Sequence, residues 1–198
     1  EIPKAVEAYA RISEIHPALA NPWCERGVGL AMLDRTDEAL ACFDRAAALE
    51  PAVPTSYDHK AVTLARSKLF DEALATLDAG LRVCPASGLL HTRRGIFLTQ
   101  TGRRAEARQA FDESLRADPA YTRVLAYRGD LEAQLGLTAE AIASLERFLA
   151  TRPAGDAKLV AAVRRQLWDL KNPGRQRDPE RGLRCQEQGL AAAARGDF

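Results

Sequence analysis

The chain has 198 residues and a formal net charge of +1, from 28 lysines and arginines against 27 aspartates and glutamates. This balance gives no overall field that would attract nucleic acid or an anionic membrane. No apolar run approaches the roughly 18 to 20 residues that a membrane-spanning helix requires. The composition therefore favours a soluble helical protein that neither binds nucleic acid nor inserts into a membrane.

Prolines recur along the chain at a constant interval of 34 residues. They are Pro17, Pro51, Pro85, Pro119 and Pro153. A fixed period of this length is typical of a solenoid, in which each unit is one supersecondary element stabilised by stacking on its neighbours. The period therefore predicts an array of similar units rather than a single globular core.

In chain order, the pattern predicts the end of one unit and then four full units, near residues 20–53, 54–87, 88–121 and 122–155. The residues that mark the first, half unit are Ala5, Tyr9, Ile12 and Pro17. Small residues recur in phase with the prolines at Gly27, Ala61, Gly95 and Gly129, and again at Ala39, Ala73, Ala107 and Ala141. Within a unit, Trp23, Gly27 and Leu30 are spaced four and three apart, which places them on one helix face. We therefore expect two helices per unit, packed closely where the small residues lie.

The order of residue classes resembles the tetratricopeptide repeat. The residues that carry the resemblance are Trp23, Gly27, Leu30, Ala39, Phe43, Ala46 and Pro51. The resemblance implies an all-α fold, a right-handed α-solenoid of helix-turn-helix repeats of 34 residues. It also implies that the first helices of the units line a concave face that binds a peptide or a partner helix.

Short polar segments separate the two expected helices of each unit. Carboxylates such as Asp37 and Glu38 fall in the first turn of the second helix, where they complement the helix dipole, and Thr36 and Thr138 are expected N-caps. The periodic proline is expected to end the second helix and turn the chain into the next unit.

The repeat pattern changes after Pro153. Residues 156–171 read as a lone first helix, with Val163 in the small position, and residues 172–179 form a polar turn rich in proline and glycine. Residues 180–198 are expected to be helical. This last helix either caps the array or begins a further, truncated repeat.

No cluster of residues indicates catalysis or metal binding. The cysteines Cys24, Cys42, Cys84 and Cys185 have no CxxC or metal-finger spacing, and the three histidines occupy different phases of the repeat. There is no glycine-rich phosphate loop, nucleophile elbow or HExxH motif. We therefore expect no catalytic residue, no metal and no cofactor in this segment, and we do not expect the segment to be an enzyme.

The resemblance assigns a partner-binding groove to the exposed positions of the first helices. These residues are Asn21, Glu25, Val28, Met32, Thr55, Asp58, His59, Val62, Arg66, Leu89, Thr92, Arg93, Ile96, Gln100, Arg123, Tyr127, Asp130 and Gln134. Val28, Val62 and Ile96 form an apolar strip at equivalent positions. Arg66 and Arg93 are among the basic residues that flank it. Such a groove suits a peptide with aliphatic anchors and some acidic residues, whereas the alternative interpretation is an ordinary solvated helix face.

The chaperone-binding members of this family hold a C-terminal carboxylate with a clamp of lysines, asparagines and an arginine. The equivalent positions here are Cys24, Val28, His59, Leu89 and Arg93, of which only Arg93 fits. A chaperone-tail receptor is therefore disfavoured.

The sequence predicts a scaffold or adaptor that binds a protein or peptide ligand in its concave groove. The alternative is the substrate-recruiting or regulatory region of a larger enzyme, of the glycosyltransferase, sulfotransferase or hydroxylase type, whose catalytic domain lies outside this segment. A third hypothesis is self-association through the exposed ends of the array.

Glu1 corresponds to a point just before the second helix of a unit, and no initiating methionine or signal sequence is present. We therefore interpret the chain as a fragment with truncated ends. The sequence does not specify a compartment, and we favour the cytoplasm. Frequent alanine and arginine, with few lysines and asparagines, indicate a GC-rich bacterial genome.

Overall fold

The computed structural model describes residues 1–151 and 156–174, and within these ranges it consists of α-helices with no strand. The helices are α1 (Ile2–Ile15), α2 (Ala20–Met32), α3 (Thr36–Leu49), α4 (Pro54–Arg66), α5 (Phe70–Val83), α6 (Gly88–Gln100), α7 (Arg104–Ala117), α8 (Val124–Gln134), α9 (Thr138–Ala150) and α10 (Ala157–Lys171). None of these helices is long and apolar enough to cross a membrane. The all-α prediction is confirmed, whereas the interpretation of residues 180–198 falls outside the described ranges.

Four of the periodic prolines, Pro17, Pro51, Pro85 and Pro119, lie just after the end of a helix. Helices α1, α3, α5 and α7 each end two residues before a proline, as α3 does at Leu49 before Pro51. This agrees with the bias against helical backbone at the residue that precedes a proline. The predicted threonine caps are wrong. Helices α3 and α9 begin at Thr36 and Thr138, and the N-cap residues are Arg35 and Leu137, without a side-chain cap.

The two helices of each pair are joined by a tight turn with one residue in the left-handed region. The residues concerned are Asp34 (φ 57°), Lys68 (φ 63°), Gly102 (φ 78°) and Gly136 (φ 75°). In the first turn, the amide of Arg35 donates to the carbonyl of Leu30 at 3.0 Å, and that of Asp34 to Ala31 at 3.3 Å. These two hydrogen bonds form a Schellman motif, which satisfies the last carbonyls of the first helix.

Small residues let the two helices of a pair approach closely. A Cβ atom added at Gly95 would lie 2.4 Å from the Phe111 ring, and one at Gly27 would lie 2.6 Å from the Phe43 ring. Both rings are only 1% exposed. The large residue of the second helix therefore occupies the space that a side chain on the first helix would need.

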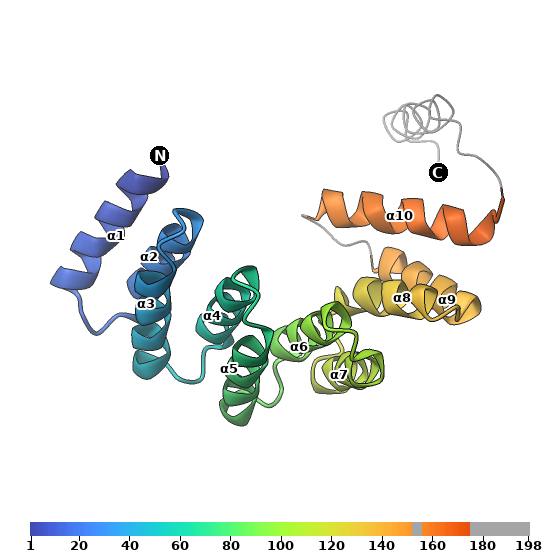
Figure 1. Ribbon diagram of the computed structural model, residues 1–198, viewed down its shortest axis with the longest axis horizontal. Helices are drawn as coiled ribbons and strands as arrows, with labels where there is room; N and C mark the ends of the chain where they lie inside the picture. Colours follow the sequence, from blue (N-terminus) through green and yellow to red (C-terminus); the bar gives the residue numbers. More distant parts are fainter. Residues whose placement is uncertain (152–155, 175–198) are drawn as a thin grey trace.

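The pairs stack into an arc whose inner side is formed by the first helices. Helix α4 contacts both α2 and α6, and α8 contacts both α6 and α10. Among the described residues, no such contact joins α3 to α5, α5 to α7 or α7 to α9. Figure 1 shows α4 and α6 on the inner side of the arc, with α5 and α7 on the outer side.

Successive pairs are joined by ion pairs that repeat with the 34-residue period. Each connects a second helix to the first helix that follows it: Lys60 to Asp44 at 2.5 Å, Arg94 to Asp78 at 2.9 Å, and Arg128 to Asp112 at 3.3 Å. At the corresponding place before these rungs, Arg26 faces a helix that carries Ala10, and the buried Nε atom of Arg26 has no hydrogen-bond partner. We call this series the ion-pair ladder.

Helix α1 leaves part of its apolar surface open. Ala5 is exposed and Ile12 is 39% exposed, whereas the equivalent residues Ala39 and Ala46 of α3 are fully buried under α2. The predicted self-association would use this surface, and it stays a prediction.

Candidate functional site

The inner face of the arc, lined by α2, α4, α6 and α8, holds two separate hollows. The N-terminal hollow measures about 100 Å³ and is lined by Val28, Ala31, Met32, Phe43, His59, Val62, Thr63 and Arg66. The C-terminal hollow measures about 180 Å³ and is lined by Asp58, Leu89, Thr92, Arg93, Ile96, Tyr121, Arg123 and Tyr127. Most of the residues expected in the groove border one of these two hollows.

The N-terminal hollow is mainly apolar. Val28 and Val62 are half-buried, and the ring of His59 stacks on that of Phe43 with the centroids 5.9 Å apart. Arg66 lies at the edge, where it donates to the carbonyl of Ala31 at 3.1 Å and to Asp34 at 3.3 Å. The hollow therefore suits an aliphatic side chain.

The C-terminal hollow is built around an ion pair between α4 and α6. The guanidinium of Arg93 donates to both carboxylate oxygens of Asp58, at 2.6 and 3.0 Å. Burial opposes the charge of Arg93, but the hydrogen bonds and charge of Asp58 outweigh it, so the pKa of Arg93 is raised. The bidentate geometry fixes the plane of the guanidinium group against the hollow.

The other polar groups of the C-terminal hollow come from the start of the fourth pair. Arg123 pairs with Asp156 at 2.8 Å, across to the residue that precedes α10. Burial raises the pKa of Tyr121. Within the described ranges, the hydroxyl groups of Tyr121 and Tyr127 make no hydrogen bond, so both can donate to a ligand.

Two residues expected to be exposed in the groove are buried. Asp58 is 5% exposed and Thr92 is 2% exposed. The Thr92 hydroxyl lies 2.9 Å from that of Ser114, which donates to the carbonyl of Gly88 at 2.9 Å. This repeat position faces the interior in every pair, since Cys24 and Ala126 are buried there too. Asp58 and Thr92 therefore hold the walls of the hollow.

The remaining predicted groove residues line neither hollow. They are Asn21, Glu25, Thr55, Gln100, Asp130 and Gln134. Asp130 accepts hydrogen bonds from Gln134 at 2.7 Å and from Gln166 of α10 at 2.8 Å, which ties α8 to α10.

Tyr121 borders the C-terminal hollow and was not predicted from the sequence. It lies in the turn before α8, which begins at Val124, two residues later in the repeat than α2, α4 and α6. An aromatic residue directly after the Pro119 turn was the available signal, but the repeat pattern assigns no role to that position.

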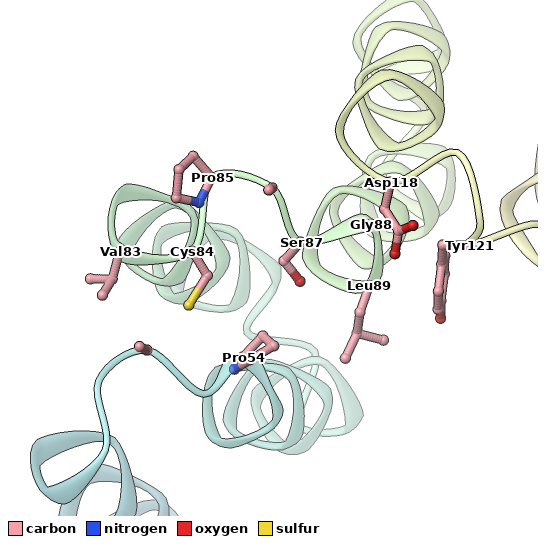
Figure 2. A pocket seen from close by; sticks show the side chains of 11 residues that line it. Pro54, Val83, Cys84, Pro85, Ser87, Gly88, Leu89, Asp118 and Tyr121 are labelled. Carbon is pink, nitrogen blue, oxygen red and sulfur yellow. The ribbon is translucent and has the colours of Figure 1, made fainter.

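A third hollow, which we call the rim pocket, lies at the edge of the array, where turns between pairs meet (Figure 2). It measures about 410 Å³ and is lined by Ala52, Pro54, Val83, Cys84, Pro85, Ala86, Ser87, Gly88, Leu89, Asp118 and Tyr121. Leu89 and Tyr121 also line the C-terminal hollow, so these two hollows adjoin.

The thiols and acidic groups of the described ranges form no group of three or more that could hold a metal ion. Cys24, Cys42 and Cys84 are free thiols, and burial raises the pKa of each. A raised thiol pKa lowers the thiolate fraction and with it the reactivity of these residues.

A family model for the tetratricopeptide repeat matches residues 27–87 and again residues 93–157. The chain belongs to the tetratricopeptide repeat family. No curated protein matches the sequence. The family assignment agrees with the paired helices and with the placement of the first helices on the inner face.

Solved tetratricopeptide repeat proteins share this fold at low sequence identity. The thermophilic repeat protein TTC0263 from Thermus thermophilus is 20% identical, with a TM-score of 0.68 over 82% of this chain and 89% of that one. MamA from Desulfovibrio magneticus RS-1 is 17% identical, with a TM-score of 0.60 over 79% and 88%. The first repeat domain of Spaghetti (RPAP3), bound to the HSP90 peptide SRMEEVD, is 19% identical, with a TM-score of 0.51 over 59% and 93%.

Proposed function

We propose that this tetratricopeptide repeat chain is a scaffold that binds a peptide or a partner helix along its inner face. The observation that carries the proposal is the placement of an apolar hollow and a polar hollow along one row of first helices. A ligand that spans both would gain apolar burial at one and charged hydrogen bonds at the other.

A similar repeat domain supports this mode of binding, because the RPAP3 domain was solved with a peptide bound. The ligand of the present chain is expected to differ. Arg93 stands at a position of the chaperone-binding clamp, but here its guanidinium is held by Asp58, and the neighbouring position is occupied by Leu89. The proposed ligand is therefore a peptide other than a chaperone tail.

Capture of partners from a lysate of the source organism, followed by mass spectrometry, tests the proposal. We expect Val28→Gln with Val62→Gln to lose the partner, because each places an amide in the N-terminal hollow. Ala41→Gln with Ala75→Gln is the matched control, since both alanines are exposed on second helices. Circular dichroism checks that both variants keep their helical content. Equal recovery of the partner by both variants would contradict binding at the inner face.

A further inference from the structure

We propose that the rim pocket and the C-terminal hollow form one binding track for an extended peptide with an aliphatic side chain and a carboxylate side chain two residues apart. The aliphatic side chain occupies the rim pocket, and the carboxylate occupies the C-terminal hollow. This inference rests on the proposed function. It narrows the ligand to one chemistry and the contact to the second, third and fourth helix pairs.

The two hollows share a wall, which sets the spacing of the two side chains. Leu89 and Tyr121 line both hollows, and in Figure 2 their side chains extend in the same direction from the start of α6 and from the turn before α8. Alternate residues of an extended chain point to the same side and are separated by about 6 to 7 Å. In the proposed track, side chains at positions i and i+2 of the peptide lie on the two sides of this wall.

A glycine holds this wall in place. Gly88 is buried at the start of α6, and a Cβ atom there would lie 2.8 Å from the Cβ of Tyr121 and 2.9 Å from that of Asp118. Only a residue without a side chain lets the turn between α7 and α8 close on α6 in this way. Gly88 therefore permits the close approach of Tyr121 to the start of α6.

The rim pocket favours an aliphatic side chain. Its walls are mostly carbon, from alanines, prolines, Val83 and Leu89. Its one formal charge is the carboxylate of Asp118, which accepts a hydrogen bond from the amide of Ala120 at 3.1 Å. A ligand carboxylate would be repelled there, so the acidic group belongs in the neighbouring hollow.

The C-terminal hollow favours a hydrogen-bond acceptor with negative charge. Two arginines and one aspartate line it. Both oxygens of that aspartate, Asp58, already accept from Arg93, and one N–H group of Arg123 is engaged by Asp156, which lies outside the lining. The groups left for a ligand are the hydroxyls of Tyr121 and Tyr127 and the remaining N–H groups of Arg93 and Arg123. A carboxylate can accept from all of these donors, whereas a lysine side chain would meet like charge.

The first and second pairs carry different residues at the positions that line the C-terminal hollow. Glu25 stands two repeats before Arg93 and has the opposite charge. Thr55 and His59 stand two repeats before Arg123 and Tyr127. The acidic group of the ligand is therefore expected in the C-terminal hollow, which has Arg93, rather than at the corresponding place in the first pairs, which has Glu25.

Fluorescence anisotropy with a labelled synthetic peptide, Gly-Ser-Leu-Ser-Glu-Ser-Gly, tests the track. We expect saturable binding that weakens about tenfold when the peptide's glutamate becomes glutamine or its leucine becomes serine. A peptide with six residues between leucine and glutamate should bind as weakly as the glutamine peptide and the serine peptide. In NMR spectra, the amide signals of Leu89 and Tyr121 should shift with the original peptide.

Variants of the protein locate the two contacts. Arg123→Gln and Val83→Ser should each weaken the peptide about fivefold. The controls Arg108→Gln, on α7, and Ile15→Ser, at the repeat position of Val83, should leave the affinity unchanged. Absence of saturation below about 1 mM, or equal binding of the glutamine peptide, would overturn the track. The proposed function would still stand if Val28→Gln with Val62→Gln lost the natural partner, and it would fail separately if that variant kept it.

Discussion

Ala107 shows how little space separates the two helices of a pair. Its side chain is fully buried, as are those of Ala39, Ala73 and Ala141 at the same repeat position. A larger side chain at any of these positions must push the neighbouring helix away or adopt a strained rotamer.

We therefore expect Ala107→Leu to lower the free energy of unfolding by about 1 to 3 kcal/mol, measured by urea denaturation. Ala105→Leu, on an exposed position of the same helix, is the control and should change stability little. Equal stability of both variants would show that Ala107 does not lie at a tight helix contact.

The sequence predicted the small and large core residues because their spacing repeats. It did not predict that Asp58 and Thr92 are buried, because polar residues normally indicate an exposed position. Each is accommodated by a partner distant in sequence, Arg93 for Asp58 and Ser114 for Thr92. A single sequence gives residue types, whereas such pairings depend on how the helices are rotated against one another.

The turn inside each helix pair requires a residue in the left-handed region, yet only two of the four turns have glycine there. Asp34 and Lys68 adopt this conformation at a cost that glycine avoids. This regularity was hidden in the sequence because two different residue types replace the glycine.

Replacing Lys68 by glycine should raise the free energy of unfolding by about 0.5 to 1 kcal/mol, since the strain at this position disappears. The reverse change, Gly102→Lys, should lower it by a similar amount. Thermal or urea unfolding measures both. A loss of stability in Lys68→Gly would contradict the left-handed conformation at this turn.

Two of the second helices begin with an arginine–glutamate pair. The Arg35 side chain hydrogen-bonds Glu38, and Arg103 does the same to Glu106, which lowers the pKa of both glutamates. A lowered pKa in the folded state means that the stabilisation is complete above the ordinary pKa of glutamate, near about 4.3. It is lost as the pH falls through the lowered value.

At pH 7, Glu38→Gln with Glu106→Gln should therefore be less stable than the parent. The difference should shrink as the pH falls below about 4.3 and vanish once both glutamates of the folded parent are protonated. Glu72→Gln with Glu140→Gln is the control. These glutamates occupy the same repeat position, but Leu69 and Leu137 stand three residues before them in place of the arginines. Urea unfolding at several pH values compares them. If the control variant loses as much stability at pH 7 as Glu38→Gln with Glu106→Gln, the stabilisation comes from the helix dipole alone and not from the arginine–glutamate pairs.

At the scale of the whole molecule, the ion-pair ladder aligns successive helix pairs. Each rung is at least partly exposed and contributes modestly, about 0.2 to 1 kcal/mol. The ladder lacks a rung at the N-terminal end, where Arg26 has no carboxylate opposite it.

Ala10→Asp should supply this rung. We expect it to be more stable than Ala10→Asn by about 0.2 to 1 kcal/mol, because the two variants share a helix propensity and differ in charge. The difference should shrink in high salt. Equal stability of the two variants in low salt would show that Arg26 does not continue the ladder.

The fold as a whole followed from the sequence because each 34-residue period contains the complete pattern of one helix pair. The hollows did not follow in the same way. They arise between pairs, where Asp58, Arg93 and Tyr127 come from three different units and no local pattern joins them.

Each first helix contacts the first helix of the next pair, whereas the second helices of successive pairs do not contact one another. The inner and outer sides of the array therefore resist bending to different degrees. Its inner side is tied at three places, by Arg66 to Asp34, Arg93 to Asp58, and Gln166 to Asp130. In the part of the chain that the structure describes, no hydrogen bond or ion pair ties α6 to α8 in this way. Among the joints between described pairs, the one beside the C-terminal hollow therefore lacks a tie on the inner side and keeps only the Arg128–Asp112 rung of the ladder. A small rotation about this rung widens or narrows the hollow without breaking a polar contact on the inner side, so the mouth of the hollow can adjust to the thickness of the chain that enters it.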